Sequence, residues 1–241
     1  MRIVLFLVAG LMLTTCELKK QPKQPADRYN QLTVEEKDNG WTLLFDGRTL
    51  NGWRIFKNQP NNSWEVTDGT LHCKAFADGT LNERSDLITT GEYGDFELSF
   101  QWKISRQGNS GVMFRVTEAY DQTYASGPEY QVIDEVNYPG DLPPENKAAA
   151  NFGMHAADST FVYPVGQWNE GKIIVQGNHV EHWLNGTRVL AYDLFSDEWN
   201  NRKTASKWKD FPGYASARKG YIALQDHGNE VWYRAIKIRN L

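Results

Sequence analysis

Cysteine is scarce in this sequence, which has only two among 241 residues, Cys16 and Cys73. If Cys16 is modified at the N-terminus, Cys73 has no partner within the chain, and an intramolecular disulfide is excluded. Stability must then come from a buried core. The composition allows one, because 40% of the residues are hydrophobic and 23% are charged, as in an ordinary single globular domain.

Excess positive charge is also missing. The formal net charge is -4 and the isoelectric point is near 5.8, and Lys/Arg-rich runs are limited to a short one near the start. A protein that holds phosphates needs a basic face. We therefore expect no nucleic-acid partner.

Long apolar runs are limited to the N-terminus, where Arg2 precedes an apolar stretch from Ile3 to Leu13. This stretch is too short to span a membrane and indicates a secretory signal over residues 1–15. Cys16 directly after it resembles the acylated cysteine of bacterial lipoproteins, although Thr15 departs from that pattern. The alternative is a simple secreted protein with an incidental cysteine.

Lipidation of Cys16 predicts attachment to a bacterial membrane through this anchor alone, with the domain in the periplasm or at the cell surface. Residues 16–30 are too polar to pack and indicate a tether, so that residues 31–241 form a single domain.

Amphipathic helices and internal repeats are nearly absent from that domain, whereas strand patterns separated by turn signals are abundant. This pattern predicts an all-β sandwich of two antiparallel sheets. Asp68-Gly69 and Asn185-Gly186 predict hairpin turns, Thr33 with Glu36 predicts a helix cap, and a short helix is expected within 196–206. The stretch 96–104 alternates and is expected to have one fully solvated face. The connection 135–150 is expected to be a functional loop.

The stretch Gly127–Asp134 is the organising element, because it carries three polar side chains on one strand. Alternation puts Glu129 and Gln131 on one face and Tyr130 and Val132 on the other. A β-bulge at Ile133 would return Asp134 to the Glu129 face. We interpret this face as the floor of a sugar-binding cleft, with a solvated edge strand as the alternative.

Two further strands pair an apolar face with an unusual polar one. Met113 and Arg115 lie opposite the inward Val112, Phe114 and Val116, and Gln225 alternates with His227. Carboxylate, amide, guanidinium and imidazole groups together can hold sugar hydroxyls and supply acid–base chemistry. Spacing alone does not say whether these strands are neighbours.

Several ordered motifs, over residues 40–241, carry a family resemblance. They are Trp41-Thr-Leu-Leu-Phe-Asp-Gly47 with Leu50-Asn-Gly-Trp53, Gly108-Asn-Ser-Gly-Val-Met-Phe-Arg115, Glu129-Tyr-Gln-Val-Ile-Asp134 and Gly220-Tyr-Ile-Ala-Leu-Gln-Asp-His-Gly228. Together they resemble the 3-keto-disaccharide hydrolase family.

This resemblance implies a concanavalin-A-like jelly roll, export to the bacterial periplasm or surface, and action on glycosides oxidised to a ketone at C3. Asn109 and Met113, within the second motif, are then candidate substrate contacts. Asn151-Phe-Gly-Met-His155 departs from the family pattern, and His155 is a further candidate contact.

The ketone suggests elimination, because a carbonyl at C3 acidifies the C2 hydrogen. We assign Glu129 as the base, Arg115 as the stabiliser of charge on O3 and His227 as the acid, with Gln131, Asp134 and Gln225 orienting hydroxyls. Glu129 and His227 are interchangeable at this stage. A divalent cation held by Glu129, Asp134 and His227 is an alternative electrophile, although their spacing matches no metal signature.

Two other functions remain open on the sequence. A tethered, non-catalytic carbohydrate-binding module would share the fold. The order Glu129, Gln131, Asp134 also resembles the acidic strand of family 16 glycoside hydrolases. There the middle residue is an acid and the last one is longer, so double displacement is disfavoured here.

Overall fold

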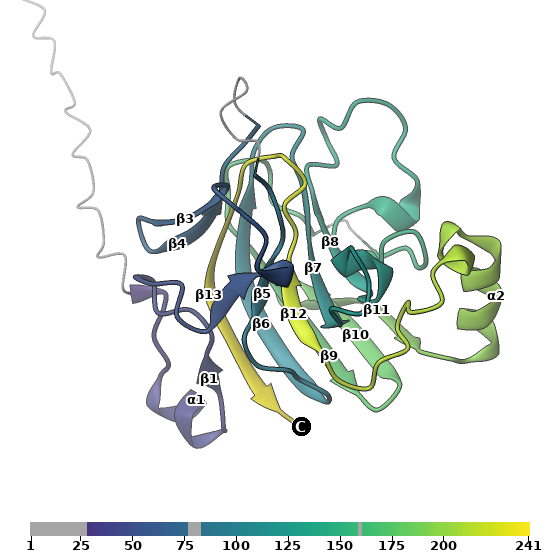
Figure 1. The fold of residues 1–241 in the computed structure, drawn as a ribbon, viewed down its shortest axis with the longest axis horizontal. Coiled ribbons are helices and arrows are strands. Elements are labelled where there is room, and N and C mark those ends of the chain that lie inside the picture. The colour runs from purple at the N-terminus through teal and green to yellow at the C-terminus, as the bar shows by residue number, and fades with distance from the viewer. Residues whose placement is uncertain (1–27, 77–82, 159–160) are drawn as a thin grey trace, which may run out of the picture.

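The computed structural model describes residues 28–76, 83–158 and 161–241 (Figure 1). The predicted signal, Cys16 and nearly all of the predicted tether lie outside the described residues.

The described chain is mostly β-structure. Its strands are β1 (Thr42–Leu43), β2 (Trp53–Ile55), β3 (Trp64–Thr67), β4 (Thr70–Cys73), β5 (Leu87–Thr89), β6 (Phe96–Ile104), β7 (Asn109–Val116), β8 (Glu129–Ile133), β9 (Asn169–Gln176), β10 (His179–Leu184), β11 (Thr187–Asp193), β12 (Tyr221–Leu224) and β13 (Val231–Asn240). Its helices are α1 (Val34–Asp38) and α2 (Asp197–Ala205), with short 3₁₀ turns η2 (Phe56–Asn58), η3 (Thr123–Ala125), η4 (Pro144–Asn146) and η5 (Lys207–Asp210).

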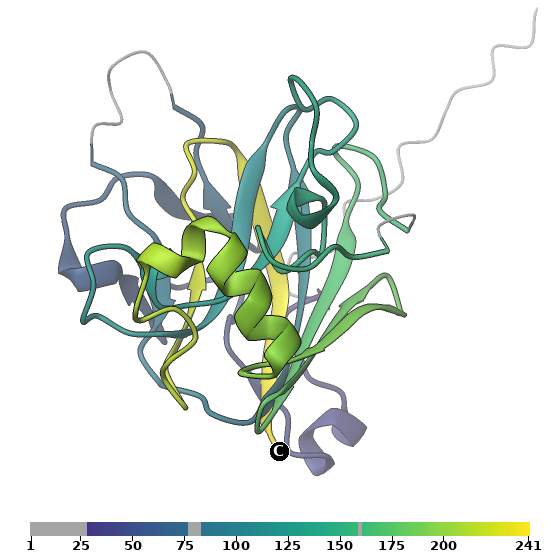
Figure 2. The same cartoon turned by 90° about the vertical axis from the view of Figure 1, so that its right-hand side faces the viewer.

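The strands form two antiparallel sheets that pack face to face. The larger sheet has the order β11-β10-β9-β6-β13-β4-β3, with β1 paired to β13, and the smaller has the order β2-β5-β12-β7-β8. In Figure 2, α2 crosses in front of the sandwich; it lies near the start of the long insertion between β11 and β12. The predicted two-sheet sandwich is confirmed.

The core lies between the sheets and follows the predicted alternation of β8. Tyr130 and Val132 are fully buried in it, and the Tyr130 ring packs edge-on against Phe100 of β6 at 5.3 Å between centroids. The outer face of β6 is less solvated than predicted. Glu97 is only 5% exposed, because Lys172 and Arg239 on the neighbouring strands β9 and β13 bind its carboxylate.

Local sequence signals set the turns and caps. Asp68-Gly69 joins β3 to β4 and Asn185-Gly186 joins β10 to β11, with positive φ at all four residues, as a two-residue hairpin turn requires. Thr33 and Glu36 form the predicted capping box of α1. The helix expected within 196–206 is α2.

A β-bulge is present, but in β7 rather than at Ile133. Tyr221 and Ala223, two residues apart on β12, pair with Val116 and Met113, three residues apart on β7, so β7 holds one extra residue there. Arg115 within this interval has φ 54°. The bulge inverts the predicted alternation after Phe114. Val116 therefore shares a cluster with Met113, on the face away from the large sheet.

The folded domain also begins earlier than residue 31. Asn30 is 4% exposed, donates to the Gly69 carbonyl oxygen at 2.8 Å and accepts from the Ala235 amide at 2.9 Å. The Arg234 guanidinium lies over the Tyr29 ring at 3.5 Å. These two residues pack on the domain, because the polar side chain of Asn30 satisfies backbone groups in the β3–β4 turn and at the irregularity within β13.

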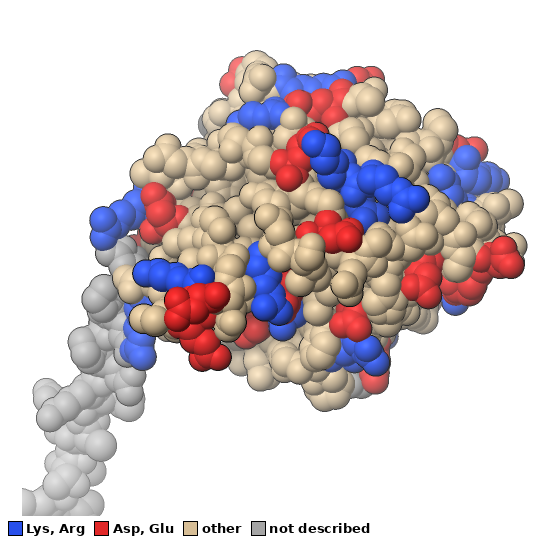
Figure 3. Space-filling model, turned by 90° about the horizontal axis from the view of Figure 1, so that it is seen from below, with Lys and Arg blue, Asp and Glu red and all other residues tan. Residues whose placement is uncertain are grey.

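The surface mixes charges of both signs. Figure 3 shows Lys and Arg side chains interspersed with Asp and Glu on the face seen from below. None of the helices in the described part of the chain has the length and apolar character needed to cross a membrane.

Candidate active site

A cavity of about 270 Å³ opens on the face of the small sheet that points away from the large one. Strands β7 and β8, the chain after β12, the turn η3, the loop before β9 and the turn η5 all contribute to it. The lining residues are Asn109, Tyr124, Glu129, Gln131, Phe152, Lys207, Trp208, Gln225 and His227.

Glu129 is held at the cavity floor by the pairing of β7 with β8. Gly111 pairs with Gln131, and a Cβ on Gly111 would lie 2.6 Å from the Glu129 carboxyl carbon. A glycine is therefore required beneath this carboxyl group. With its amide nitrogen turned to satisfy its neighbours, Gln131 donates to the Ser110 carbonyl oxygen at 2.9 Å and to Glu129 Oε1 at 3.2 Å.

Burial controls the charge of Glu129. The residue is 4% exposed, and loss of solvation raises the pKa of its carboxyl group to about 8. Lys207 opposes this shift, because its positive charge favours the carboxylate. Burial also lowers the pKa of the Lys207 ammonium group, whereas Glu129 raises it. The two residues are thus an electrostatically coupled pair in one cavity.

Aromatic side chains form a wall of the cavity. Trp208 donates its indole N–H to the Phe152 carbonyl oxygen at 3.0 Å and stacks on Tyr214 at 4.2 Å between ring centroids. Lys207 Nζ lies 4.4 Å from the Phe152 ring centroid and 4.5 Å from that of Trp208. The Phe152 ring is partly exposed and offers apolar surface to a ligand, whereas Trp208 is fully buried. The Lys207 ammonium group lies at the faces of both rings.

The chain after β12 supplies the opposite polar groups. The backbone N–H of Gln225 donates to the Gly111 carbonyl oxygen at 2.9 Å, so the chain continues alongside β7 beyond the end of β12. Gln225 Oε1 is buried and has no hydrogen-bond partner among the described residues. His227 is exposed at the edge of the cavity.

The structure thus brings together five of the predicted site residues, namely Glu129, Gln131, Gln225, His227 and Asn109. The sequence analysis did not identify Lys207, Trp208, Tyr124 or Phe152. Phe152 belongs to the stretch 151–155 that departs from the family pattern, which was the available signal. Lys207 and Trp208 come from an insertion distant in sequence, and spacing does not reveal such a contact.

Arg115 was predicted to face the substrate, and this is wrong. The bulge turns the Arg115 side chain away from the cavity. The residue is 1% exposed, and its guanidinium group donates to the Gly177 carbonyl oxygen at 2.8 Å. Asp95 lies 3.5 Å from the same guanidinium nitrogen. Burial lowers the pKa of Arg115. Its contacts join β7 to the turn between β9 and β10.

Asp134 does not join Glu129 either, since β8 pairs with β7 through Ile133 without a register shift. Its carboxylate instead accepts the Gln107 amide N–H at 2.8 Å and the Asn137 amide N–H at 3.2 Å. The suggested cation set of Glu129, Asp134 and His227 is therefore not assembled. Among the described residues there is no group of three or more His, Cys, Asp or Glu side chains that could hold a metal ion.

Met113 and His155 are also displaced from the predicted contacts. Met113 is fully buried in an apolar cluster with Phe56 and Ile88, because the sheet surface beside the cavity is covered. His155 is 5% exposed, lies 3.1 Å from Glu198 Oε2 and stacks on Tyr192. It lines a separate surface cavity rather than the one around Glu129.

Comparison with known proteins gives this geometry a context. Residues 40–239 match the model of the 3-keto-alpha-glucoside-1,2-lyase-like domain. A 3-keto-disaccharide hydrolase from Bacteroides thetaiotaomicron is 32% identical over 237 residues, which span 88% of this chain and 81% of that protein.

Solved structures agree with these sequence matches. A protein from Parabacteroides distasonis, assigned to the glycosyl hydrolases, superposes with a TM-score of 0.81 at 35% identity and covers 88% of this chain and 99% of its own. A Bacillus subtilis protein with a galectin-like fold superposes with a TM-score of 0.53 at 14% identity, over 80% of this chain and 92% of its own, and shares the fold alone.

Proposed function

We propose a substrate and a mechanism for this chain, which belongs to the family of 3-keto-alpha-glucoside-1,2-lyase-like domains and is a glycosidase-type enzyme. The substrate is a disaccharide or glucoside whose C3 hydroxyl has been oxidised to a ketone. The observation that carries the proposal is the buried carboxyl group of Glu129, whose pKa is raised to about 8 at the floor of a partly open cavity.

The reaction is an elimination followed by hydration. A base removes the C2 hydrogen, and the electrons of that bond form the enolate of the C3 ketone. The enolate then expels the C1 oxygen, which takes a proton from an acid and leaves as an alcohol. Water adds across the resulting C1–C2 double bond of the enone and gives the free 3-keto sugar, so the sum of the steps is hydrolysis.

Glu129 acts as the base. A carboxylate in water is a weak base, but one whose pKa is about 8 takes up a carbon-bound proton more readily and still ionises near neutral pH. The hydrogen bond from Gln131 and the positive charge of Lys207 stabilise the Glu129 carboxylate after the carboxyl group has ionised. His227 lies exposed at the edge of the cavity and protonates the C1 oxygen as it departs, because the leaving group lies at the opening toward solvent.

Lys207 takes the part first assigned to Arg115. Negative charge develops on the C3 oxygen during proton removal, and a cation aimed at it stabilises the enolate. Lys207 carries the cationic charge of the cavity lining, and its ammonium group lies at the faces of Phe152 and Trp208. The neighbouring positive charge also keeps the Glu129 pKa from rising further.

The remaining polar groups orient the sugar. Gln225 Oε1 is buried without a partner among the described residues, which favours a hydroxyl group donated by a ligand. Asn109 and Gln131 offer further amide groups, and the partly exposed rings of Tyr124 and Phe152 offer apolar surface to the ring C–H groups. The cavity volume, at the lower end for small-molecule sites, suits one sugar ring with the leaving group at the opening.

The two alternatives have less support. A non-catalytic binding module needs a shallow groove and has no use for a buried carboxyl group that costs stability. Double displacement, as in family 16 glycoside hydrolases, needs two carboxyl groups about 5 to 5.5 Å apart. Glu129 contributes the carboxyl group of this cavity lining, Gln131 is an amide, and Asp134 lies outside it.

The test is incubation with a 3-keto-disaccharide and, separately, with its unoxidised parent, while free sugar is followed by chromatography. We expect cleavage of the ketone alone and loss of that cleavage in Glu129→Gln. Equal cleavage of the unoxidised parent would contradict the proposed substrate class.

We also propose export and lipid anchoring through Cys16, with the domain in the periplasm or at the cell surface. The support is the sequence pattern of residues 1–16 alone. Several acyl chains are needed for stable attachment. In cell fractionation, Cys16→Ser should move the protein from the membrane to the soluble fraction, and unchanged partitioning would contradict the anchor.

A further inference from the structure

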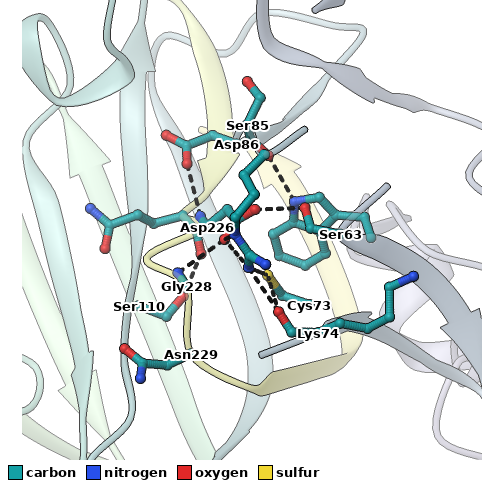
Figure 4. Close-up of polar contacts among 12 residues, drawn as sticks. Ser63, Cys73, Lys74, Ser85, Asp86, Ser110, Asp226, Gly228 and Asn229 are labelled. Carbon is teal, nitrogen blue, oxygen red and sulfur yellow. Dashed lines mark hydrogen bonds and ion pairs between the residues drawn. The ribbon is translucent and has the colours of Figure 1, made fainter. Parts of the chain in front are cut away.

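Asp226 separates Gln225 from His227 in sequence, and its side chain points away from the cavity that they line. Its carboxylate is fully buried in a polar network behind the cavity wall (Figure 4). The mechanism above gives Asp226 no part. A fully buried carboxylate is costly unless every lone pair is used, and this one is surrounded by donors.

The network around Asp226 comes from three distant segments. Ser63 Oγ donates to Asp226 Oδ2 at 2.6 Å, and Arg84 Nε donates to Oδ1 at 2.9 Å, with Arg84 Nη2 close to the same oxygen. Arg84 Nη2 also donates to the Lys74 carbonyl oxygen at 2.7 Å, which ties the guanidinium to the large sheet. One residue of the cavity segment is thereby joined to both sheets (Figure 4).

The backbone of the segment is held by the same network. The Asp226 amide N–H donates to Asp86 Oδ1 at 2.8 Å, and the Gly228 amide N–H donates to Asp226 Oδ1 at 3.0 Å. Asp86 is oriented in turn by the hydroxyl group of Thr123, which lies in η3, the turn that also carries Tyr124. Fixing the φ and ψ angles of residues 225–228 fixes the directions in which Gln225 and His227 leave the chain.

We infer that Asp226, held by Ser63, Arg84 and Asp86, is a positioning residue that sets His227 and Gln225 at the cavity. The inference rests on the proposed function for the acid role of His227, but the contacts of Asp226 do not depend on the substrate. His227 is exposed and has no hydrogen-bond partner of its own in the described structure, so the backbone is what sets its place. Misplacement on the order of 1 Å can cost about 100-fold in rate.

The test is a double-mutant cycle on cleavage of a 3-keto-disaccharide. Asp226→Asn keeps the size of the side chain and removes the charge that Arg84 and Ser63 bind. We expect kcat to fall about 10- to 100-fold, as displaced catalytic groups do, with a smaller change in KM. In a His227→Ala background the same substitution should cost clearly less, because only the displacement of Gln225 then remains and effects that act through one group are not additive.

Glu97→Gln is the matched control. Glu97 is also a buried carboxylate, bound by Lys172 and Arg239, but it lies on β6 of the other sheet. Glu97→Gln should lower the melting temperature about as much as Asp226→Asn does and leave kcat unchanged. Ser63→Ala, which removes one hydrogen bond, provides a milder variant if Asp226→Asn folds poorly, and we expect an intermediate loss of kcat.

A second readout separates this inference from the proposed function. Hydrogen exchange of the Gln225 and Asp226 amides needs no substrate, and we expect Asp226→Asn to speed it at least about tenfold while Glu97→Gln does not, because local opening follows local contacts. Faster exchange without any cleavage of 3-keto sugars would overturn the proposed chemistry alone. Unchanged exchange, or an equal kcat loss with and without His227, would overturn the positioning role.

Discussion

Gly111 and Glu129 lie on adjacent strands so closely that a Cβ atom on Gly111 would fall 2.6 Å from the carboxyl carbon and 2.7 Å from Cγ of Glu129. Because Gly111 of β7 has no side chain, the Glu129 carboxyl group of β8 can lie directly above it. The cavity floor is thus defined by a glycine as much as by the acid.

Gly111→Ala should therefore displace the Glu129 carboxyl group and lower kcat about 100-fold, since catalysis depends on the position of the base. Steady-state cleavage of a 3-keto-disaccharide measures this. Gly94→Ala is the control, because a Cβ there meets its nearest neighbour, the Arg218 carbonyl oxygen, at an ordinary 3.5 Å. A Gly111→Ala enzyme with normal kcat would contradict the packing argument.

The pH dependence of kcat/KM should rise through a pKa of about 8, as Glu129 loses its proton. Lys207 lowers that pKa, so Lys207→Met should move the rising limb to higher pH and also reduce the rate at its plateau. Lys209→Met, an exposed lysine two residues away, should change neither. An identical limb in wild type and Lys207→Met would contradict the coupling of Lys207 to Glu129.

Stability should depend on pH in the opposite sense. The Glu129 pKa is raised from 4.5 to about 8 on folding, so the unfolded chain loses this proton first, and the free energy of unfolding falls as pH rises from about 4.5 to 8. Glu129→Gln lacks this titration. The variant should be more stable than wild type above pH 8 and show no advantage below pH 4. The difference in the free energy of unfolding should grow by roughly one kcal/mol for each pH unit between these limits and reach a few kcal/mol. Urea unfolding at pH 4 and pH 9 measures the difference, and equal stability at pH 9 would mean that the carboxyl group is solvated.

The sequence predicted the sandwich because its evidence is local. Alternation on β8 assigns Tyr130 to the core and Glu129 to the opposite face, and Asn185-Gly186 specifies its own turn. Arg115 shows where local evidence ends. One additional residue in β7 reverses the direction of the side chains that follow it in this strand. Only the pairing of β7 with β12, which is distant in sequence, reveals this residue.

The site was predictable to the same extent. Glu129 and Gln131 follow from alternation, and Gln225 and His227 from their motif, whereas Lys207 and Trp208 enter through the insertion that contains α2. Asp226 looked equivalent to its neighbours in sequence, and only the fold shows that its carboxylate meets Ser63 and Arg84.

Arg115 should prove structural. Its guanidinium is buried against the Gly177 carbonyl oxygen, so Arg115→Met leaves that acceptor without its donor, which typically costs about 1 to 3 kcal/mol. Asp95 loses the ion pair but still accepts the Gly177 amide N–H. We expect a lower melting temperature with kcat within about threefold of wild type, measured well below the transition. Normal stability combined with lost turnover would return Arg115 to the chemistry.

The central claim is that the C2 hydrogen leaves before the C1 oxygen, and solvent exchange tests it most directly. In deuterated buffer, a 3-keto-disaccharide treated with the wild-type enzyme should give product with deuterium at C2, read by NMR or mass spectrometry. Glu129→Gln should lose exchange and cleavage together, each by about 10² to 10⁴, whereas His227→Ala should still exchange while cleaving slowly. Cleaved product without deuterium at C2 would contradict elimination and make Glu129 a candidate nucleophile.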